Sequence, residues 1–366
     1  MSRPLDSFLD ERIDRGDIPG GVYAVAGPEG ILDEGARGLA VTGDAPVTAT
    51  LDTIYDLASL TKPLVTSLLY LALSEELGLP AGTPVRRLVP AMDRNDKRDI
   101  TLHHLLTHTS GLPDWLPLYL RGRTMDEYLR QIGEVAPVAG PGARVIYSDL
   151  GYILLGEVLA RAATATLDEL AHHQIASRLG LRATAFRPPA AWGARVAATE
   201  DSCHYERTLS RDVAGERAAG YDGFRRGVIR GEVHDQNAWA VGGVAGHAGL
   251  FGTAGEVASI AREYLGAGTS MLTGRALDLA RHDATPGLEE ARSYAFRLAL
   301  RGDTAAGPRM SGRSFGHNGF TGTSVWIDPE TGRIFVLLTN RVHPAVSKTV
   351  DMVALRRRFH EVAGSV

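Results

Sequence analysis

The apolar positions of the chain follow a strand-like pattern near both ends and a helical pattern between them. Short apolar runs bounded by turn residues predict strands over 20–27, 30–35, 315–327 and 333–340. Apolar residues at helical spacing predict helices over 4–16, 150–159, 254–266 and 346–363. Thr253 and Glu256 are predicted to form a capping box at the start of the third helix. The stretch 188–231 is weakly periodic, and we expect loops there.

The most strongly apolar helix is predicted to begin at Ser59. Leu60, Leu64 and Leu68 recur at helical spacing, which predicts about four buried turns. Pro63 is tolerated only near a helix start, so we expect an irregular or 3₁₀ first turn. Ser59 is therefore expected where unpaired backbone N–H groups and the positive end of the helix dipole face outward.

Strands at both ends, with helices inserted between them, predict an α+β fold. The expected architecture is an antiparallel sheet flanked by helices, with a large helical insertion. Residues 1–80 and 250–366 are expected to form a discontinuous α/β sheet domain. Residues 81–249 are expected to form a mainly helical insertion domain, with the active site in the cleft between the two.

The composition argues against nucleic-acid binding, cysteine-based metal clusters and membrane-spanning segments. The 366 residues, 44% hydrophobic and 22% charged, can bury a large core, and a net charge of -4 gives no footprint for nucleic acid. The single Cys203 excludes an intrachain disulfide and a cysteine metal cluster, and we expect it to be a bystander. No apolar run suits a membrane segment or a signal peptide, so we expect a cytoplasmic protein unless a leader was removed. Oligomeric state is left open.

Ser59 and Lys62 form the first candidate pair for chemistry. Lysine and arginine total 39, yet only Lys62, Lys97 and Lys348 are lysines. Lys62 lies three residues after Ser59, on the same helical face. Unlike arginine, a desolvated lysine can lose its proton and serve a nucleophile as base. The alternative is an N-cap serine followed by a lysine whose stem packs on apolar surface.

Tyr147 and Asp149 are the next candidates. Among the 11 tyrosines, only Tyr147 has Asp or Asn two residues later. A phenol beside a lysine ammonium can have its pKa drawn down and accept the serine proton. The alternative for Asp149 is that it caps the helix that follows.

His317, Asn318 and Gly319 lie in a predicted strand, where a glycine lets a substrate backbone approach the edge. The competing His-x-Gly sequence begins at His247. We favour His317 as a substrate-binding residue because His247 lies in a glycine-rich loop.

Several other patterns indicate weaker sites. The sequence 312–316 matches Gly-x-Ser-x-Gly, but that nucleophile turn needs a strand before it and a helix after it. His103, His104 and His108 resemble a zinc cluster, although no Glu lies between them and no further ligand is evident. We therefore expect no metal and no organic cofactor. The polar run 233–237 either borders the cleft or fixes a loop, and Trp115 either lines an acyl pocket or belongs to the core.

The three candidate groups together resemble a known family. Ser59-Leu60-Thr61-Lys62, Tyr147-Ser148-Asp149 and His317-Asn318-Gly319, in this order, are similar to the motifs of the penicillin-recognising serine hydrolases. The stretches 105–113 and 248–254 resemble the branch that contains class C β-lactamases, D,D-carboxypeptidases, D-aminopeptidases and related esterases. The resemblance implies a β-lactamase/transpeptidase-like fold and a small ester, amide or lactam as substrate.

The same resemblance implies a role for each residue. Ser59 would be acylated, and Lys62 and Tyr147 would shuttle its proton. The backbone N–H groups of Ser59 and Phe320 would form the oxyanion hole. Asp149 would hold the substrate amide or the Lys62 ammonium. The cationic residue of the family's third motif would be replaced by His317.

Two departures from the family pattern bear on the substrate. His317 stands where the family favours lysine, and it is only partly charged at neutral pH. Asp149 stands where the family favours asparagine, and an ionised carboxylate only accepts hydrogen bonds. Both changes favour an esterase or an amidase acting on D-amino-acid derivatives over a lactamase. The rival interpretation is a binding protein that keeps the scaffold without turnover, although Ser59, Lys62 and Tyr147 are all present.

Overall fold

The structure is a computed structural model that describes residues 3–269, 271–272, 274–302 and 304–365. Within these ranges, seven strands form one sheet in the order β3-β2-β1-β12-β11-β10-β9. The strands are β1 (Gly20–Gly27), β2 (Gly30–Val41), β3 (Val47–Thr48), β9 (Arg297–Leu298), β10 (Phe315–Asn318), β11 (Ser324–Asp328) and β12 (Arg333–Thr339). Every pairing between neighbours in this sheet is antiparallel, and the predicted antiparallel sheet is confirmed.

The two ends of the chain meet in the middle of this sheet. Strand β1 pairs with β12, with Val22 opposite Leu338 and Val25 opposite Phe335. Side chains alternate between the two faces of a strand, so Val22 and Leu338 enter the main core while Val25 and Phe335 enter a second, smaller core. The sheet therefore needs helices on both of its faces.

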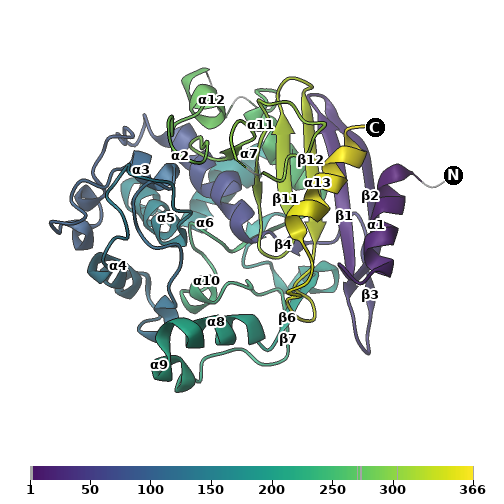
Figure 1. The fold of residues 1–366 in the computed structure, drawn as a ribbon, viewed down its shortest axis with the longest axis horizontal. Helices are drawn as coiled ribbons and strands as arrows, with labels where there is room; N and C mark the ends of the chain where they lie inside the picture. The colour runs from purple at the N-terminus through teal and green to yellow at the C-terminus, as the bar shows by residue number, and fades with distance from the viewer. Residues whose placement is uncertain (1–2, 270, 273, 303, 366) are drawn as a thin grey trace.

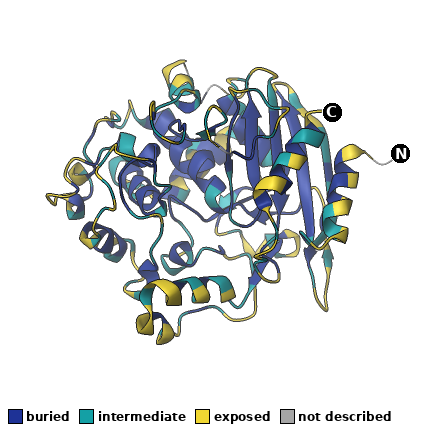
Figure 2. Ribbon diagram, in the orientation of Figure 1, coloured by how far each residue is buried: buried dark blue, intermediate teal, exposed yellow. Residues whose placement is uncertain are grey.

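Helices α1 (Pro4–Asp14) and α13 (Met352–Ala363) cover the face of the smaller core (Figure 1). Leu5, Leu9 and Phe359 are the apolar anchors of this layer, and the outward faces of both helices are exposed (Figure 2). Helix α11 (Ala254–Tyr264) and the helical segment Ala58–Leu73 pack in the main core on the other face.

The segment Ala58–Leu73 changes its helical type along its length. It begins as a 3₁₀ turn (Ala58–Leu60), passes through a π-helical stretch (Lys62–Ser67) and ends as α2 (Leu68–Leu73). Pro63 lies in the π-helical stretch, and the predicted irregular first turn is observed. Ser59 thus lies on a tight turn, with the buried helix behind it.

The remaining elements lie beside the sheet and carry most of the helices. The helices are α3 (Leu102–Leu106), α4 (Met125–Glu134), α5 (Asp149–Ala163), α6 (Leu167–Leu170), α7 (Ser177–Leu179), α8 (His204–Ala214), α9 (Glu216–Ala219), α10 (Gln236–Ala240) and α12 (Gly274–Arg281). In the described residues two smaller sheets join them, formed by β4 (Tyr55–Asp56), β8 (Leu250–Gly252) and β5 (Ala185–Phe186), and by β6 (Ala198–Asp201) and β7 (Val228–Arg230). The division into domains at residues 80 and 249 stays a prediction.

Three local predictions are wrong. The stretch 315–327 forms two strands, β10 and β11, because the chain turns at 319–323. The stretch 188–231 contains α8, α9, β6 and β7 rather than loops alone. Thr253 does cap α11, but the Glu256 carboxylate accepts from the N–H groups of Arg182 and Ala183 instead of closing a capping box.

Among the described residues, no single helix has both the length and the apolar character that crossing a membrane requires. The pair Asp149–Ala163 and Leu167–Leu179 meets that test only when taken together, across a bend of 77°.

Candidate active site

Ser59 is positioned by a turn that several side chains hold in place. Strand β4 delivers the chain to this turn, and Ala58 adopts a left-handed φ of 48°, which is strained for a residue other than glycine. The Asp56 carboxylate accepts from the Ala58 N–H at 2.8 Å. The hydroxyls of Thr321 and Thr323 donate to the carbonyls of the two residues that precede Ala58. The β10–β11 turn therefore fixes the backbone that carries Ser59.

Lys62 is fully buried directly beneath Ser59. Its Nζ donates to Ser59 Oγ at 3.0 Å and to the His247 carbonyl at 3.2 Å, and it lies 2.8 Å from Asp149 Oδ1. Burial acts to lower the pKa of Lys62, but the charges of Asp149 and Tyr147 outweigh it and raise the pKa above its ordinary value. Asp149 therefore compensates the buried charge of Lys62 and opposes the loss of its proton.

Tyr147 lies among cations and imidazoles. Lys62 Nζ is 4.8 Å from the centre of its ring, and the Arg292 guanidinium is 5.5 Å from it. The rings of His108 and His317 lie 4.5 and 5.8 Å away. Tyr147 therefore lies within reach of the Lys62 ammonium, as a group that exchanges a proton with the Ser59–Lys62 pair requires.

Asp149 and Ser148 open helix α5. The Ser148 hydroxyl accepts from the Gly151 N–H and is the N-cap, so the alternative cap role for Asp149 is wrong. Asp149 is the first residue of the helix, and its carboxylate turns to Lys62 instead.

His317 lies on β10 and is buried. Its Nδ1 donates to the neighbouring Asn318 carbonyl at 3.0 Å. Burial, followed by the charges of Lys62 and Arg292, holds the pKa of His317 well below its usual value. The expectation of a partly charged residue here is therefore wrong, since His317 is neutral at neutral pH.

The side chains above surround one cavity of about 650 Å³. Its lining includes most of the predicted site residues, namely Ser59, Trp115, Tyr147, Asp149, His317, Asn318, Gly319 and Phe320. Lys62 lies beneath the floor. The cavity brings together residues that are separated by more than 250 positions in the sequence.

The turn between β10 and β11 is fixed from the opposite side by Arg356 of α13. This guanidinium, which is 5% exposed, donates to the carbonyls of Gly319 at 2.8 Å and Thr323 at 3.0 Å. In a trans peptide the C=O and the following N–H point in opposite directions, so the Phe320 N–H faces away from Arg356. A Cβ at Gly319 would lie 2.7 Å from the Leu57 carbonyl, so only glycine lets this turn approach the Ser59 segment.

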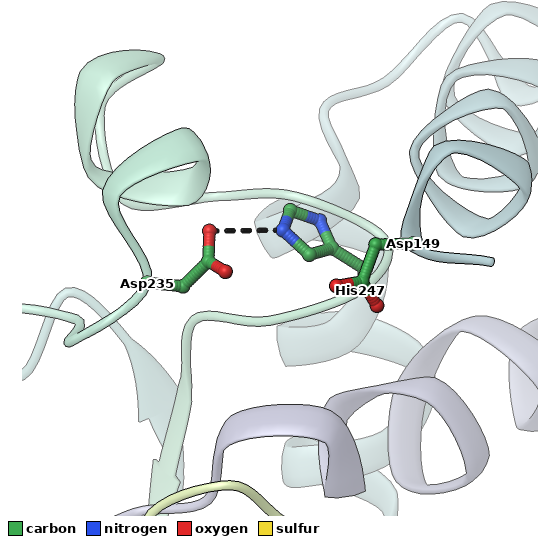
Figure 3. A group of neighbouring side chains, drawn as sticks. All are labelled: Asp149, Asp235 and His247. Carbon is green, nitrogen blue, oxygen red and sulfur yellow. Dashed lines mark hydrogen bonds and ion pairs between the residues drawn. The ribbon is translucent and has the colours of Figure 1, made fainter. Parts of the chain in front are cut away.

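A second group of side chains lies on the helical side of the cavity. Asp235, the N-cap of α10, accepts a hydrogen bond from His247 Nε2 at 3.0 Å, and Asp149 lies beside the same imidazole (Figure 3). The ligand atoms of these three side chains lie within 4.8 Å of one another. Glu206 of α8 lines the same cavity.

Sequence reasoning missed Arg292 and Glu206 as cavity residues. Neither belongs to a recognised motif, and Glu206 lies in the stretch that was expected to form loops. Asp235 was noted only within a polar run, and that run does border the cavity. The charge of these residues was the available signal, but charge alone does not separate a cavity wall from a solvated surface.

The residues of the two alternative sites, the histidine cluster and the Gly-x-Ser-x-Gly sequence, have other structural roles. His103 contacts the Tyr294 hydroxyl, His104 pairs with Thr101, and His108 Nδ1 accepts from the Ser148 N–H. Each of these histidines therefore has a protein partner. Ser314, in the Gly-x-Ser-x-Gly sequence, is fully buried, and a strand follows it instead of a helix.

With this geometry in place, the sequence can be compared with known families. The profile of a family described as Beta-lactamase matches residues 5–357. The chain belongs to the beta-lactamase family.

Relatives and solved structures agree with this membership. A protein of Escherichia coli strain K12, named a putative D-alanyl-D-alanine carboxypeptidase, is 30% identical over 329 residues, covering 83% of this chain and 73% of the relative. EstCE1, a hydrolase with promiscuous acyltransferase activity, superposes with a TM-score of 0.75 at 21% identity, covering 98% and 97% of the two chains. A penicillin-binding protein homologue from Pyrococcus abyssi gives 0.71 at 22% identity, covering 96% and 76%.

These comparisons confirm the β-lactamase/transpeptidase-like fold and the resemblance to the penicillin-recognising enzymes. As a member of the beta-lactamase family, the protein is a serine hydrolase.

Proposed function

We propose that this family member cleaves a small ester or amide through an acyl-enzyme on Ser59. The observation that carries the proposal is the 3.0 Å contact between Lys62 Nζ and Ser59 Oγ, beside Tyr147 in one cavity. This arrangement joins a nucleophile, a buried cation and a second proton carrier.

The proton path follows from the state of Lys62. The charge of Asp149 raises the pKa of Lys62 and favours its ammonium form, and we assign the role of base to Tyr147 beside it. Ser59 Oγ attacks the substrate carbonyl carbon while its proton passes to Tyr147. Tyr147 then returns the proton to the leaving oxygen or nitrogen as the C–O or C–N bond breaks. Water attacks the acyl-enzyme by the same path and releases the acid.

The negative oxygen of the tetrahedral intermediate requires two hydrogen-bond donors. We assign these to the backbone N–H groups of Ser59 and Phe320. The assignment is supported by Arg356, which anchors the Gly319 carbonyl and so orients the Phe320 N–H away from α13.

The substrate class is a carboxylic ester or an amide of the D-amino-acid type. The neutral His317 supports this proposal, because it offers no permanent charge for a substrate carboxylate. A D,D-carboxypeptidase or β-lactamase is the second candidate. It is supported by the guanidinium groups of Arg292, Arg297, Arg341 and Arg356 along the cavity, and by the printed names of the relatives.

The experiment is a hydrolysis panel run with the wild type and the Ser59→Ala variant. It contains p-nitrophenyl butyrate, D-alanine p-nitroanilide and nitrocefin. We expect ester or amide cleavage that is lost in the variant, and labelling of Ser59 by a fluorophosphonate probe, read by mass spectrometry. Fast nitrocefin cleavage would instead favour the lactamase candidate. An unlabelled Ser59 with no turnover would favour a non-catalytic scaffold protein.

A further inference from the structure

The cavity is lined by both acidic and basic side chains. Acidic side chains come from the helical part of the chain: Asp114, Asp149, Glu206 and Asp235. Basic side chains come from the C-terminal part that builds the sheet and α13: Arg292, Arg297, Arg341 and Arg356. A substrate in this cavity therefore meets groups of both charges.

The acids differ in how far their charges are compensated. Asp149 pairs with Lys62, and Asp235 accepts from His247. Glu206 is only 6% exposed, and its Oε1 is buried without a hydrogen-bond partner. Burial, followed by the negative charge of Asp235, holds the pKa of the Glu206 carboxyl well above its usual value. A buried polar atom without a partner is costly in a native protein and requires an explanation, of which a functional role is one.

His247 supplies a second unpartnered group in the same wall. Its Nε2 donates to Asp235, because a carboxylate can only accept. In a neutral imidazole with this tautomer Nδ1 is an acceptor. This atom is also buried without a partner, in a residue that is 1% exposed. The neighbouring Asp235 is partly exposed and reaches the cavity. Acceptors on His247, Asp235 and Glu206 match the chemistry of a primary ammonium, which carries one charge and three N–H donors.

The wall is close enough to Ser59 to recognise the acyl part of a substrate. Lys62 Nζ is 3.0 Å from Ser59 Oγ and 2.8 Å from Asp149 Oδ1, and Asp149 and Asp235 offer oxygens within 4.8 Å of each other. These contacts link Ser59 to the acidic wall through Lys62 and Asp149, so the acyl part of a substrate bound at Ser59 enters the part of the cavity that this wall borders.

We propose that Glu206, Asp235 and His247 bind the free ammonium group of the substrate's acyl part. The preferred substrates are then esters or amides of amino acids with an unblocked amine. This inference rests on the proposed acyl-enzyme function of Ser59 and narrows its substrate class.

A metal ion is the competing occupant, because Asp149, Asp235 and His247 are metal-binding residue types. The Lys62 ammonium, 2.8 Å from Asp149, repels a divalent cation, and His247 Nε2 already donates to Asp235. An organic ammonium carries a single positive charge, and it can donate to these acceptors without breaking the hydrogen bond between His247 and Asp235.

The kinetic test compares D-alanine p-nitroanilide with its N-acetyl derivative, in which an uncharged acetamide replaces the ammonium. We expect wild-type kcat/KM to favour the free amine by about tenfold or more, the size of one well-placed charged contact. Glu206→Gln and Asp235→Asn should reduce this ratio. Asparagine can still cap α10, so Asp235→Asn keeps the helix start. Asp212→Asn removes an exposed carboxylate from the same helix as Glu206, outside the cavity lining, and should leave the ratio unchanged.

A binding measurement separates this inference from the proposed function. In the Ser59→Ala background, calorimetry with D-alaninamide and N-acetyl-D-alaninamide reports recognition without turnover. Tighter binding of the free amine, weakened by Glu206→Gln, supports the inference even if no substrate is cleaved. Equal binding, together with an equal kcat/KM for the two anilides, overturns it while Ser59 labelling leaves the proposed function standing. Dependence of activity on added Zn²⁺, abolished by EDTA, without amine selectivity would assign the group to a metal and overturn it.

Discussion

The floor of the cavity and its α8 wall are built in opposite ways. Around Ser59, buried polar side chains find protein partners: Thr61 Oγ1 donates to the Ala58 carbonyl, and Thr66 Oγ1 donates to the Gly246 carbonyl. The wall contains two buried polar atoms without hydrogen-bond partners, Glu206 Oε1 and His247 Nδ1. Behind the floor, Tyr55 Oη and Arg356 Nε are also buried without partners, so the contrast is sharpest at the helical segment that carries Ser59.

The packing of the two regions follows the same contrast. The helical segment behind Ser59 is buried from Leu60 to Leu71, while only Glu206 and Ser210 of α8 are buried. Val213 of α8 is 51% exposed beside the cavity. A tightly packed floor suits chemistry that needs fixed distances, and a more exposed wall suits recognition of a variable substrate group. The following predictions test this division of roles.

The largest effect is expected from Ser59→Ala. Loss of the nucleophile should lower kcat by about 10⁴-fold or more. The fold should remain, because Lys62 keeps its contacts with Asp149 and the His247 carbonyl, and stability should change by less than about 1 kcal/mol. Turnover of p-nitrophenyl butyrate and thermal unfolding would measure the two effects. If ester-cleaving activity co-purifies with the Ser59→Ala variant, the nucleophile is a residue other than Ser59.

Lys62→Arg should also abolish most of the activity although it conserves the charge. The guanidinium is larger than the fully buried ammonium and cannot reproduce its contacts with Ser59 and Asp149. We expect kcat to fall by about 10³-fold, with a loss of stability of about 1–3 kcal/mol from overpacking. Steady-state kinetics and denaturant unfolding would check this. A Lys62→Arg variant with wild-type kcat would remove lysine from the mechanism.

The same contrast explains what the sequence could predict. Ser59, Lys62 and Tyr147 lie in short motifs with fixed spacing, because a helix turn or a helix start sets their geometry locally. The sheet and its flanking helices were predictable for a similar reason, since apolar periodicity follows directly from burial on one face.

The α8 wall could not be predicted in this way. Glu206, Asp235 and His247 come from separate elements, and only the tertiary packing brings them together. The same holds for Arg292 and Arg356. The turn at 319–323 was missed because its flanks, 315–318 and 324–327, are both apolar enough to be one continuous strand. The charge of His317 was misjudged because burial, which no motif reports, decides its pKa.

Arg356→Met should have an intermediate effect on activity. It tests the β10–β11 turn, which Arg356 of α13 holds from the side opposite the cavity. The variant removes one of the donors to each of the Gly319 and Thr323 carbonyls and leaves only the backbone N–H groups of the turn, so the turn carrying the Phe320 N–H is less well fixed. We expect kcat to fall by about 10–100-fold with a smaller change in KM, because the oxyanion contact strengthens in the transition state. Arg358→Met, on the exposed side of the same helix, is the matched control. Equal kinetics in the two variants would remove Arg356 from the positioning of this turn.

The smallest effect concerns the pH dependence of stability at His317. Its folded-state pKa lies below the unfolded value of about 6.5, so below that pH the unfolded state binds more protons. Stability from the neutral histidine should therefore fall as pH decreases from about 6.5, by at most about 1.4 kcal/mol per pH unit, until the folded-state pKa is passed. Glutamine cannot titrate, so His317→Gln should flatten this part of the curve, measured by urea unfolding between about pH 7.5 and 5. His282→Gln, at an exposed histidine, controls for the loss of a titrating side chain. Parallel curves for wild type and His317→Gln would mean that His317 is not held neutral by the packed floor, and the contrast with the α8 wall would then rest on hydrogen bonding alone.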